Sequence, residues 1–391
     1  MYRMLSMKKT FLLCFLAMLA ACHSPERYEA QKNSGSESGG SDFGTIYEVN
    51  GGHQICNPSV TMDERNFPAS MLWLNFSGTL NVTDAPKDFS VNRVGEHDRL
   101  SISDTAGRVL WFLMTDSVPG ADCEFQDPEW AAGGRFVVAL GGFNAKGSKG
   151  CDDVEYGIFA ARLSDNATFF LVDSAVGEYG DPHLWVGEPA ETGDSASSLE
   201  KFFGTRNVKL VYSDGSGLVY VDYAKSEKPV RLFHPDSVPG SELGNPLISP
   251  DGKFVVYHRL ASSYEWNSYV QELSPDSKPV EIGKIDGMLS NPVFPHWWSF
   301  NDRLYVVWAE FAAGNSYLNK NDLLKESTWD ASVGRTAMRE ISVTAGAPRD
   351  VSVELLGNVR EIAPVPLIGG RSPEGHFAST GTNNGYLLYI P

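Results

Sequence analysis

The chain has 391 residues, of which 12% are aromatic, 38 are glycine and 22 are proline. This composition is typical of a packed, turn-rich domain and argues against a disordered chain. The formal net charge of −17 at pH 7 repels phosphate backbones, so we expect no nucleic-acid partner.

The first predicted element is a secretory signal peptide over residues 1–21. A basic segment at residues 7–9 precedes an apolar run at residues 10–21 that ends in small residues. The run is shorter than the roughly 20 apolar residues that a membrane-spanning helix needs. The sequence Leu-Ala-Ala-Cys at residues 19–22 resembles the lipobox of bacterial lipoproteins, which implies that Cys22 is diacylated and becomes the first residue.

A lipidated, flexible tether is predicted over residues 22–42, and a folded domain over residues 43–391. The tether is almost free of apolar residues, so it cannot bury enough surface to offset its ordering entropy. Acyl chains on Cys22 would hold the protein on a lipid bilayer. By resemblance to the enterobacterial sorting rule, His23 in place of Asp favours the outer membrane, while the face of that membrane stays open.

Cysteine use agrees with export. Beyond the signal and Cys22, the chain contains Cys56, Cys123 and Cys151. We favour a disulfide between Cys123 and Cys151, because both flank the same predicted strand pair, and such a bridge contributes roughly 3–4 kcal/mol. The alternative is three unpaired, mostly buried cysteines.

An internal repeat predicts the fold class. Residues 116–138 and 236–256 share Asp-Ser-Val-Pro-Gly, then Asp-Pro or Asn-Pro, then Gly-Arg/Lys-Phe-Val-Val. Weaker copies at residues 57–63, 173–182, 291–292 and 370–375 complete six units. Each unit contains short β-branched and aromatic runs bounded by Gly, Pro, Asp and Ser, which is typical of antiparallel strands and tight turns.

We therefore predict an all-β fold, a β-propeller of six four-stranded blades, because a radial arrangement leaves only short sheet edges. The strand at residues 386–390 ends a unit that is one strand short. Residues 45–49 form an orphan strand at the other end, so pairing the two would close the ring. The alternative is five blades, which is the count if the first unit, with its insertion at residues 79–97, is not a blade. No amphipathic helix is predicted after the signal.

The chain resembles two known families. Residues 245–256, with Asn-Pro-x-x-Ser-Pro-Asp-Gly-Lys-Phe, resemble the repeat of the TolB-type six-bladed propellers. Residues 244–391, with Asn-Pro-Val-Phe-Pro-His-Trp at 291–297 and Gly-Gly-Arg-Ser-Pro-Glu at 369–374, resemble the C-terminal region of the Fibrobacter paralogous lipoprotein family. Members of that family are predicted lipoproteins of unknown function.

Asp127-Pro128 and Asp181-Pro182 are the candidate catalytic features. They resemble the Asp-Pro at the start of inner strands in five-bladed glycoside hydrolases, which implies that Asp127 and Asp181 could be the catalytic carboxylates. The same position is Asn at residues 57, 245 and 291, so a turn residue that bonds its own backbone is the simpler interpretation.

Aromatic residues are the candidate binding features. His296, Trp297 and Trp298 follow a predicted inner strand, and Trp266 lies beside a loop, where exposed rings could stack on sugars or peptide side chains. Core packing between blades is the alternative for each tryptophan. The sequence has no nucleophile elbow, phosphate-binding glycine loop or zinc-type histidine spacing, so we expect no metal and no cofactor.

These features favour a non-catalytic binding platform on the cell envelope, whose partner is a protein or a polysaccharide. The first alternative is a glycoside hydrolase that uses Asp127 or Asp181. The second is a structural component of the envelope.

Overall fold

The computed structural model describes residues 45–390 apart from gaps, of which the longest are 76–96, 233–242, 314–328 and 364–376. Residues 1–44 and 391 are not described either. The predicted signal peptide, the lipobox with Cys22, and the tether therefore lie outside the described residues. In the part that is described, no helix is long and apolar enough to cross a membrane.

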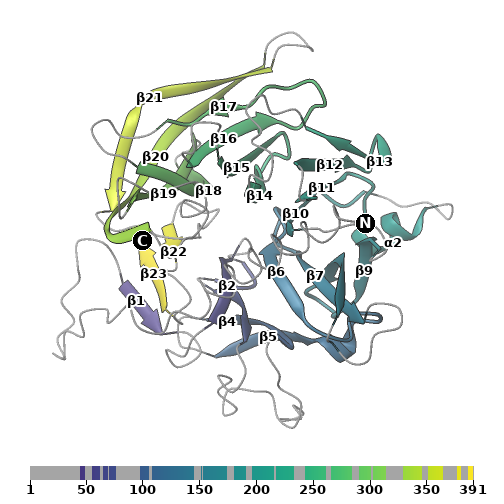
Figure 1. The fold of residues 1–391 in the computed structure, drawn as a ribbon. Coiled ribbons are helices and arrows are strands. Elements are labelled where there is room, and N and C mark those ends of the chain that lie inside the picture. The colour runs from purple at the N-terminus through teal and green to yellow at the C-terminus, as the bar shows by residue number, and fades with distance from the viewer. Residues whose placement is uncertain are drawn as a thin grey trace, which may run out of the picture.

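The strands form six sheets around a common axis, so the fold is an all-β propeller (Figure 1). Five sheets have four antiparallel strands in sequential order, and we call them blades 1–5 in chain order. The inner strands are β2 (Ile55–Val60), β6 (Phe125–Trp130), β10 (Gly180–Val186), β14 (Leu243–Ile248) and β18 (Ser290–Phe300). The second strands are β3 (Met71–Asn75), β7 (Phe136–Asn144), β11 (Val208–Ser213), β15 (Phe254–Leu260) and β19 (Arg303–Ala313).

The third strands are β4 (Arg99–Ser103), β8 (Val154–Arg162), β12 (Leu218–Asp222), β16 (Trp266–Glu272) and β20 (Trp329–Ala345). The outer strands are β5 (Val109–Met114), β9 (Thr168–Val172), β13 (Ser226–Arg231), β17 (Val280–Glu281) and β21 (Val351–Ala363). A short 3-10 turn, η4 (Thr115–Ser117), follows β5. Consecutive inner strands from β2 to β18 contact one another, which brings the starts of the blades together near the axis.

The sixth sheet has three strands, in the order β1 (Thr45–Glu48), β23 (Tyr386–Ile390) and β22 (Phe377–Ser379). Strand β1 pairs antiparallel with β23, from Thr45 opposite Tyr389 to Glu48 opposite Tyr386. The predicted pairing of the two ends of the chain is therefore present.

The prediction of six four-stranded blades is wrong in its strand count, because the described residues give five four-stranded blades and one three-stranded sheet. Among the described residues the C-terminal unit contributes β22 and β23, and β1 completes a sheet of three. Residues 370–375, which the repeat assigns to the sixth unit, fall in the gap at 364–376.

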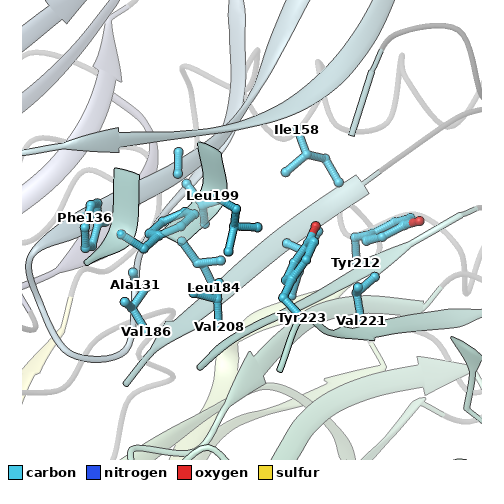
Figure 2. Packing of buried hydrophobic residues seen from close by; sticks show 14 of the residues in the cluster. Ala131, Phe136, Ile158, Leu184, Val186, Leu199, Val208, Tyr212, Val221 and Tyr223 are labelled. Atoms are coloured by element: carbon cyan, nitrogen blue, oxygen red, sulfur yellow. The ribbon is translucent and has the colours of Figure 1, made fainter. Parts of the chain in front are cut away.

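Apolar clusters between neighbouring blades hold the ring together. In β7, Val137 packs into the cluster between blades 1 and 2, whereas Phe136 and Val138 pack into the cluster between blades 2 and 3. Figure 2 shows this second cluster, which contains Phe136 of blade 2 together with Leu184 and Val208 of blade 3. Because successive side chains point to opposite faces, a strand buried on both faces is a continuous apolar run.

A short helix, α2 (Ser198–Phe203), packs against the outer strand of blade 2. Its capping box is complete, since the Glu200 amide donates to the Ser197 hydroxyl and the Ser197 amide donates to the Glu200 carboxylate. Phe202 of the helix stacks on Phe169 of β9, with ring centroids 5.4 Å apart. The sequence predicted no amphipathic helix after the signal, and the structure adds this helix of six residues. Six residues are too few for hydrophobic periodicity to reveal, although Ser-x-x-Glu is the pattern of a helix start.

Candidate functional site

Each inner strand of blades 1–5 contains one β-bulge near its start. The ladder to the second strand skips there, and the residue at the skip has a positive φ and is followed by proline. The five bulge residues are Asn57 (φ 44°), Asp127 (φ 45°), Asp181 (φ 44°), Asn245 (φ 54°) and Phe294 (φ 52°). Proline has no N–H to donate, so it is tolerated where the ladder is interrupted.

The bulge of blade 5 does not lie at the position that the repeat predicts. The sequence places the fifth copy at Asn291-Pro292, but these residues pair regularly with Phe311 and Glu310 of β19. The bulge lies at Phe294, before Pro295. Two X-Pro pairs compete in this strand, and only the pairing register with β19 decides between them.

Four bulge residues and Pro295, which follows the fifth, link the blades. We call these five residues the inner-strand belt, and they are Asn57, Asp127, Asp181, Asn245 and Pro295. Asn57 Nδ2 donates to Asp127 Oδ1 at 2.9 Å, and the Asp181 amide donates to Asp127 Oδ2 at 3.4 Å. The Asn245 amide donates to Asp181 Oδ2 at 3.1 Å, and Asn245 Nδ2 donates to the Pro295 carbonyl at 3.3 Å. One belt residue from each blade therefore bonds to the next blade.

The carboxyl group of Asp127 in the belt has a raised pKa. Burial raises the pKa of its carboxyl, while the hydrogen bonds from the Asp181 backbone and the Asn57 side chain oppose the rise. Both of its oxygens accept hydrogen bonds from neighbouring blades. The two predicted catalytic aspartates are thus adjacent. Their described hydrogen bonds run to neighbouring blades, whereas the turn interpretation expected bonds to their own backbone.

A second polar cluster lies beside the belt, at the end of the propeller where the inner strands begin. We call His97, Glu124, Gln126 and Tyr156 the mouth cluster. The Tyr156 hydroxyl donates to Glu124 Oε1, Gln126 Nε2 lies 2.9 Å from His97 Nδ1, and His97 Nδ1 lies 3.9 Å from Glu124 Oε2. Burial raises the pKa of Tyr156, and the charges of Glu124 and Asp127 add to the rise, so the phenol is a neutral donor.

His97 is the strained member of the mouth cluster. Its φ is +56° and its side chain is 2% exposed, and burial lowers the pKa of its imidazole to about 4. The His97 amide donates to the Asn75 carbonyl, and the His97 carbonyl accepts from the Phe125 amide, so the residue joins blades 1 and 2. Positive φ is uncommon at residues other than glycine, although histidine adopts it more often than most side chains, as asparagine and aspartate do.

A disulfide borders the mouth cluster. Cys123 and Cys151 are bonded, with Cα atoms 5.4 Å apart, and Cys123 immediately precedes Glu124. The bond fixes the segment that carries Glu124 against the segment between β7 and β8. The sequence predicts this cysteine pair but does not mark Glu124, His97 or Tyr156 as site residues, because no motif connects these three positions.

Two of the predicted binding aromatics are buried instead of exposed. Trp266 is 3% exposed and packs edge-on against His258, with centroids 5.1 Å apart. Trp297 is 0% exposed, and its Nε1 donates to the Leu247 carbonyl of blade 4 at 2.7 Å. Core packing therefore overrides the predicted surface role, because adjacent blades need large apolar side chains between them.

His296 and Trp298 are half-buried. His296 Nδ1 lies 2.6 Å from the Phe294 carbonyl, next to the bulge of blade 5, and the Trp298 ring lies 5.4 Å from that of Tyr305. The structure does not bring the four predicted aromatics onto one surface. A hollow of about 50 Å³ lined by Tyr305, Arg339 and Leu356 lies on blade 5, away from the belt, and is too small for a ligand.

No protein-family model and no curated protein matches the chain. Among solved structures, a putative TolB from Agrobacterium tumefaciens is 12% identical over 88% of this chain and 97% of that chain, with a TM-score of 0.43. An exo-1,5-alpha-L-arabinanase from a bovine ruminal metagenomic library is 10% identical over 78% and 97% of the two chains, with a TM-score of 0.38. At these values the likenesses carry no functional argument. The strand topology defines the class of protein, a β-propeller.

Proposed function

We propose that this protein is a non-catalytic binding platform, which presents the end of the propeller where the inner strands begin to a protein or polysaccharide partner. The observation that carries the proposal is the position of Asp127. Both of its carboxylate oxygens are held by neighbouring blades, through Asn57 Nδ2 and the Asp181 amide, as a structural link requires. An acid or nucleophile must instead turn an oxygen toward its substrate.

The mouth cluster is the recognition surface in this proposal. Glu124 is 23% exposed, and Gln126 and Tyr156 are half-buried, so acceptors and donors are both within reach of a partner. His97 stays neutral near pH 7 because its pKa is lowered, and the disulfide at Cys123 fixes the position of Glu124. Preorganised polar groups of this kind recognise hydroxyl and amide groups at a lower entropic cost.

One pair of double variants tests the proposal. The first probe is insoluble plant polysaccharide. The Glu124→Gln, Tyr156→Phe double variant should bind it about tenfold more weakly than the wild type, because two polar contacts are lost. Asp127→Asn with Asp181→Asn should bind like the wild type, since Asn already occupies the same position at residues 57 and 245. Glu188→Gln, an exposed glutamate beyond the other end of β10, is the matched control.

A glycoside hydrolase is the second candidate. It is favoured by one observation, the raised pKa of Asp127 next to a second aspartate, which is what a general acid with a carboxylate partner requires. Release of reducing sugar by the wild type that is lost in the Asp127→Asn, Asp181→Asn variant would establish it and exclude the binding-only function. No release by either protein is the result that our proposal expects.

We further propose that Cys22 carries the lipid anchor that places this platform on the outer membrane. The support is the lipobox at residues 19–22 and the polar segment after it. Mass spectrometry of the native N-terminal peptide should find acyl chains on Cys22, and Cys22→Ser should release the protein from the membrane fraction. Crosslinking in the native cell to one dominant protein would instead favour the structural envelope component.

A further inference from the structure

A glycine at the start of blade 4 brings two polar atoms from different blades close together. Gly244 of β14 lies opposite His258 of β15, one residue before the bulge at Asn245. A Cβ added to Gly244 would lie 2.6 Å from His258 Nε2 and 3.3 Å from Asp181 Oδ2. The imidazole of blade 4 and the carboxylate of blade 3 therefore face the same space, at the end of the propeller where the inner strands begin.

A hydrogen bond determines which nitrogen of His258 carries the proton. Nδ1 lies 2.9 Å from the Phe294 amide, which can only donate, so Nδ1 accepts and is unprotonated. Burial lowers the pKa of the imidazole to about 3, so the ring is neutral near pH 7 and its proton is on Nε2. No acceptor among the described residues bonds to this N–H, although His258 is only 7% exposed. A donor held in this way favours an acceptor from outside the chain.

Asp181 supplies an acceptor beside this donor. Its Oδ2 accepts from the Asn245 amide at 3.1 Å, which fixes the oxygen next to Gly244. A carboxylate oxygen has more than one lone pair, so Oδ2 can accept a second hydrogen bond. Asp181 and Gly244 are both partly exposed, so a group from solvent can reach this position. Asp181→Asn would keep the acceptor, because the Asn245 amide orients the side-chain oxygen of an asparagine in the same way.

We propose that His258 Nε2 and Asp181 Oδ2 together bind one hydroxyl group of a neutral sugar. A hydroxyl accepts through its oxygen and donates through its hydrogen, so it satisfies both groups at once. The two atoms lie within 3.3 Å of one point, which is close enough for a single oxygen to bond to both. A metal cation is excluded because Nε2 carries a proton, and the carboxylate repels an anion.

An aromatic ring beside these atoms favours a sugar over another hydroxyl compound. The Phe294 ring is half-buried and meets the His258 ring edge-on, with centroids 5.1 Å apart. It offers an apolar surface to the C–H groups that accompany each hydroxyl of a sugar ring. Phe294 also has a positive φ, which is a real outlier for a bulky side chain and is seen where a ring is held for a function.

Other blades show why this arrangement is particular to blade 4. The residue before the bulge is Gln126 in blade 2, where its side chain bonds within the mouth cluster. In blade 3 it is Gly180, which lies opposite Ser213, and the nearest atom to an added Cβ is 4.0 Å away. In the described part of the chain, only Gly244 combines a missing side chain with a histidine opposite it.

Gly244→Ala tests the site in the full chain, with Gly180→Ala as the matched control. The probes are cellohexaose, xylohexaose and mannohexaose, measured by titration calorimetry. The wild type should bind at least one of them, and Gly244→Ala should raise its Kd about tenfold or more, because the methyl group lies between the two bonding atoms. Gly180→Ala should bind like the wild type. A wild type that binds none of the three, or a Gly244→Ala variant with an unchanged Kd, overturns the proposal.

Two variants of His258 separate the donor from the stability of the fold. Asparagine places its oxygen near the position of Nδ1, where it accepts from the Phe294 amide, but has no group at Nε2. Glutamine places its amide nitrogen near Nε2 and can still donate to the sugar. His258→Asn should therefore raise the Kd about tenfold, whereas His258→Gln should keep an affinity close to that of the wild type. Equal affinities of the two variants would overturn the role of Nε2.

This inference rests on the proposed function for the class of partner, a polysaccharide, but it fails separately. Retention on insoluble polysaccharide that falls in the Glu124→Gln, Tyr156→Phe variant and not in Gly244→Ala overturns only the hydroxyl site. The reverse result overturns only the mouth cluster as the recognition surface. A chain that binds no sugar but crosslinks to a protein partner overturns the hydroxyl site and leaves the binding platform in place.

Discussion

Trp185 of blade 3 lies directly against Gly252 of blade 4. A Cβ added to Gly252 would come within 2.5 Å of Cε2 of the indole, and Trp185 Nε1 donates to the Pro250 carbonyl at 2.9 Å. The Lys209 ammonium lies 5.3 Å from the centre of the same ring and donates to the Gly252 carbonyl. The turn of the most conspicuous repeat copy is therefore a contact between blades as well as a tight turn.

Gly252→Ala should destabilise the protein by more than backbone strain alone. Gly252 has φ +71°, which costs a residue with a Cβ about 1–2 kcal/mol, and the overlap with Trp185 adds about 1–3 kcal/mol. Gly204→Ala is the matched control, because φ is also +71° there but the nearest atom to an added Cβ is 3.9 Å away. Urea unfolding of both variants measures the two losses in the free energy of unfolding. Equal losses would show that the Trp185 side chain moves aside without destabilising the protein.

Trp297→Phe should lower the free energy of unfolding by about 1–3 kcal/mol, because the buried Leu247 carbonyl loses its donor. Trp130 forms the same contact in blade 2, where its Nε1 donates to the Ser59 carbonyl at 3.2 Å, so Trp130→Phe should cost a similar amount. The half-buried Trp298 serves as the control, and Trp298→Phe should cost less. Thermal unfolding distinguishes these roles from a surface role, in which partner binding would fall and stability would not.

Acid should weaken the fold through its buried histidines. Burial, with a smaller effect of nearby His296, lowers the pKa of His258 to about 3, and His258 Nδ1 accepts from the Phe294 amide at 2.9 Å. Because the folded pKa lies below the unfolded value of about 6.5, the stability from neutral His258 is complete above pH 6.5 and is lost as the pH falls toward 3. The free energy of unfolding should fall by up to about 1.4 kcal/mol per pH unit per histidine.

His258→Gln should flatten this pH dependence, measured as the slope of the unfolding free energy between pH 6.5 and pH 4. His97→Gln should remove a second part of the slope, since the pKa of His97 is lowered to about 4 by burial. Slopes that are the same in both variants and in the wild type would mean that other groups govern acid unfolding.

Removal of the disulfide should lower the free energy of unfolding by roughly 3–4 kcal/mol. This is the loop-closure contribution expected for a bridge with a sequence separation of 28 residues. Cys123→Ser with Cys151→Ser should show this loss in urea unfolding, and a reductant should produce it in the wild type. The reductant should have no further effect on the double variant. If it does, a different thiol pair carries the stability.

The amino-acid sequence by itself determined the local features of this protein. Short β-branched and aromatic runs, turn residues and the repeated X-Pro position predict the β-strands and the propeller class, because each signal lies in a short stretch of chain. The pairing of the strand predicted at residues 45–49 with the C-terminal strand follows from the propeller class, because the repeat leaves the last unit one strand short. The cysteine pair also follows from its placement beside one strand pair.

Only the tertiary structure decided what depends on register and on neighbouring blades. Pairing with β19 places the fifth bulge at Phe294 instead of Asn291, and packing between blades buries Trp266 and Trp297. The mouth cluster brings together His97 of blade 1 and Glu124, Gln126 and Tyr156 of blade 2. A sequence pattern shows that a side chain is polar or aromatic, but whether it meets solvent or another blade depends on contacts between residues far apart in the chain.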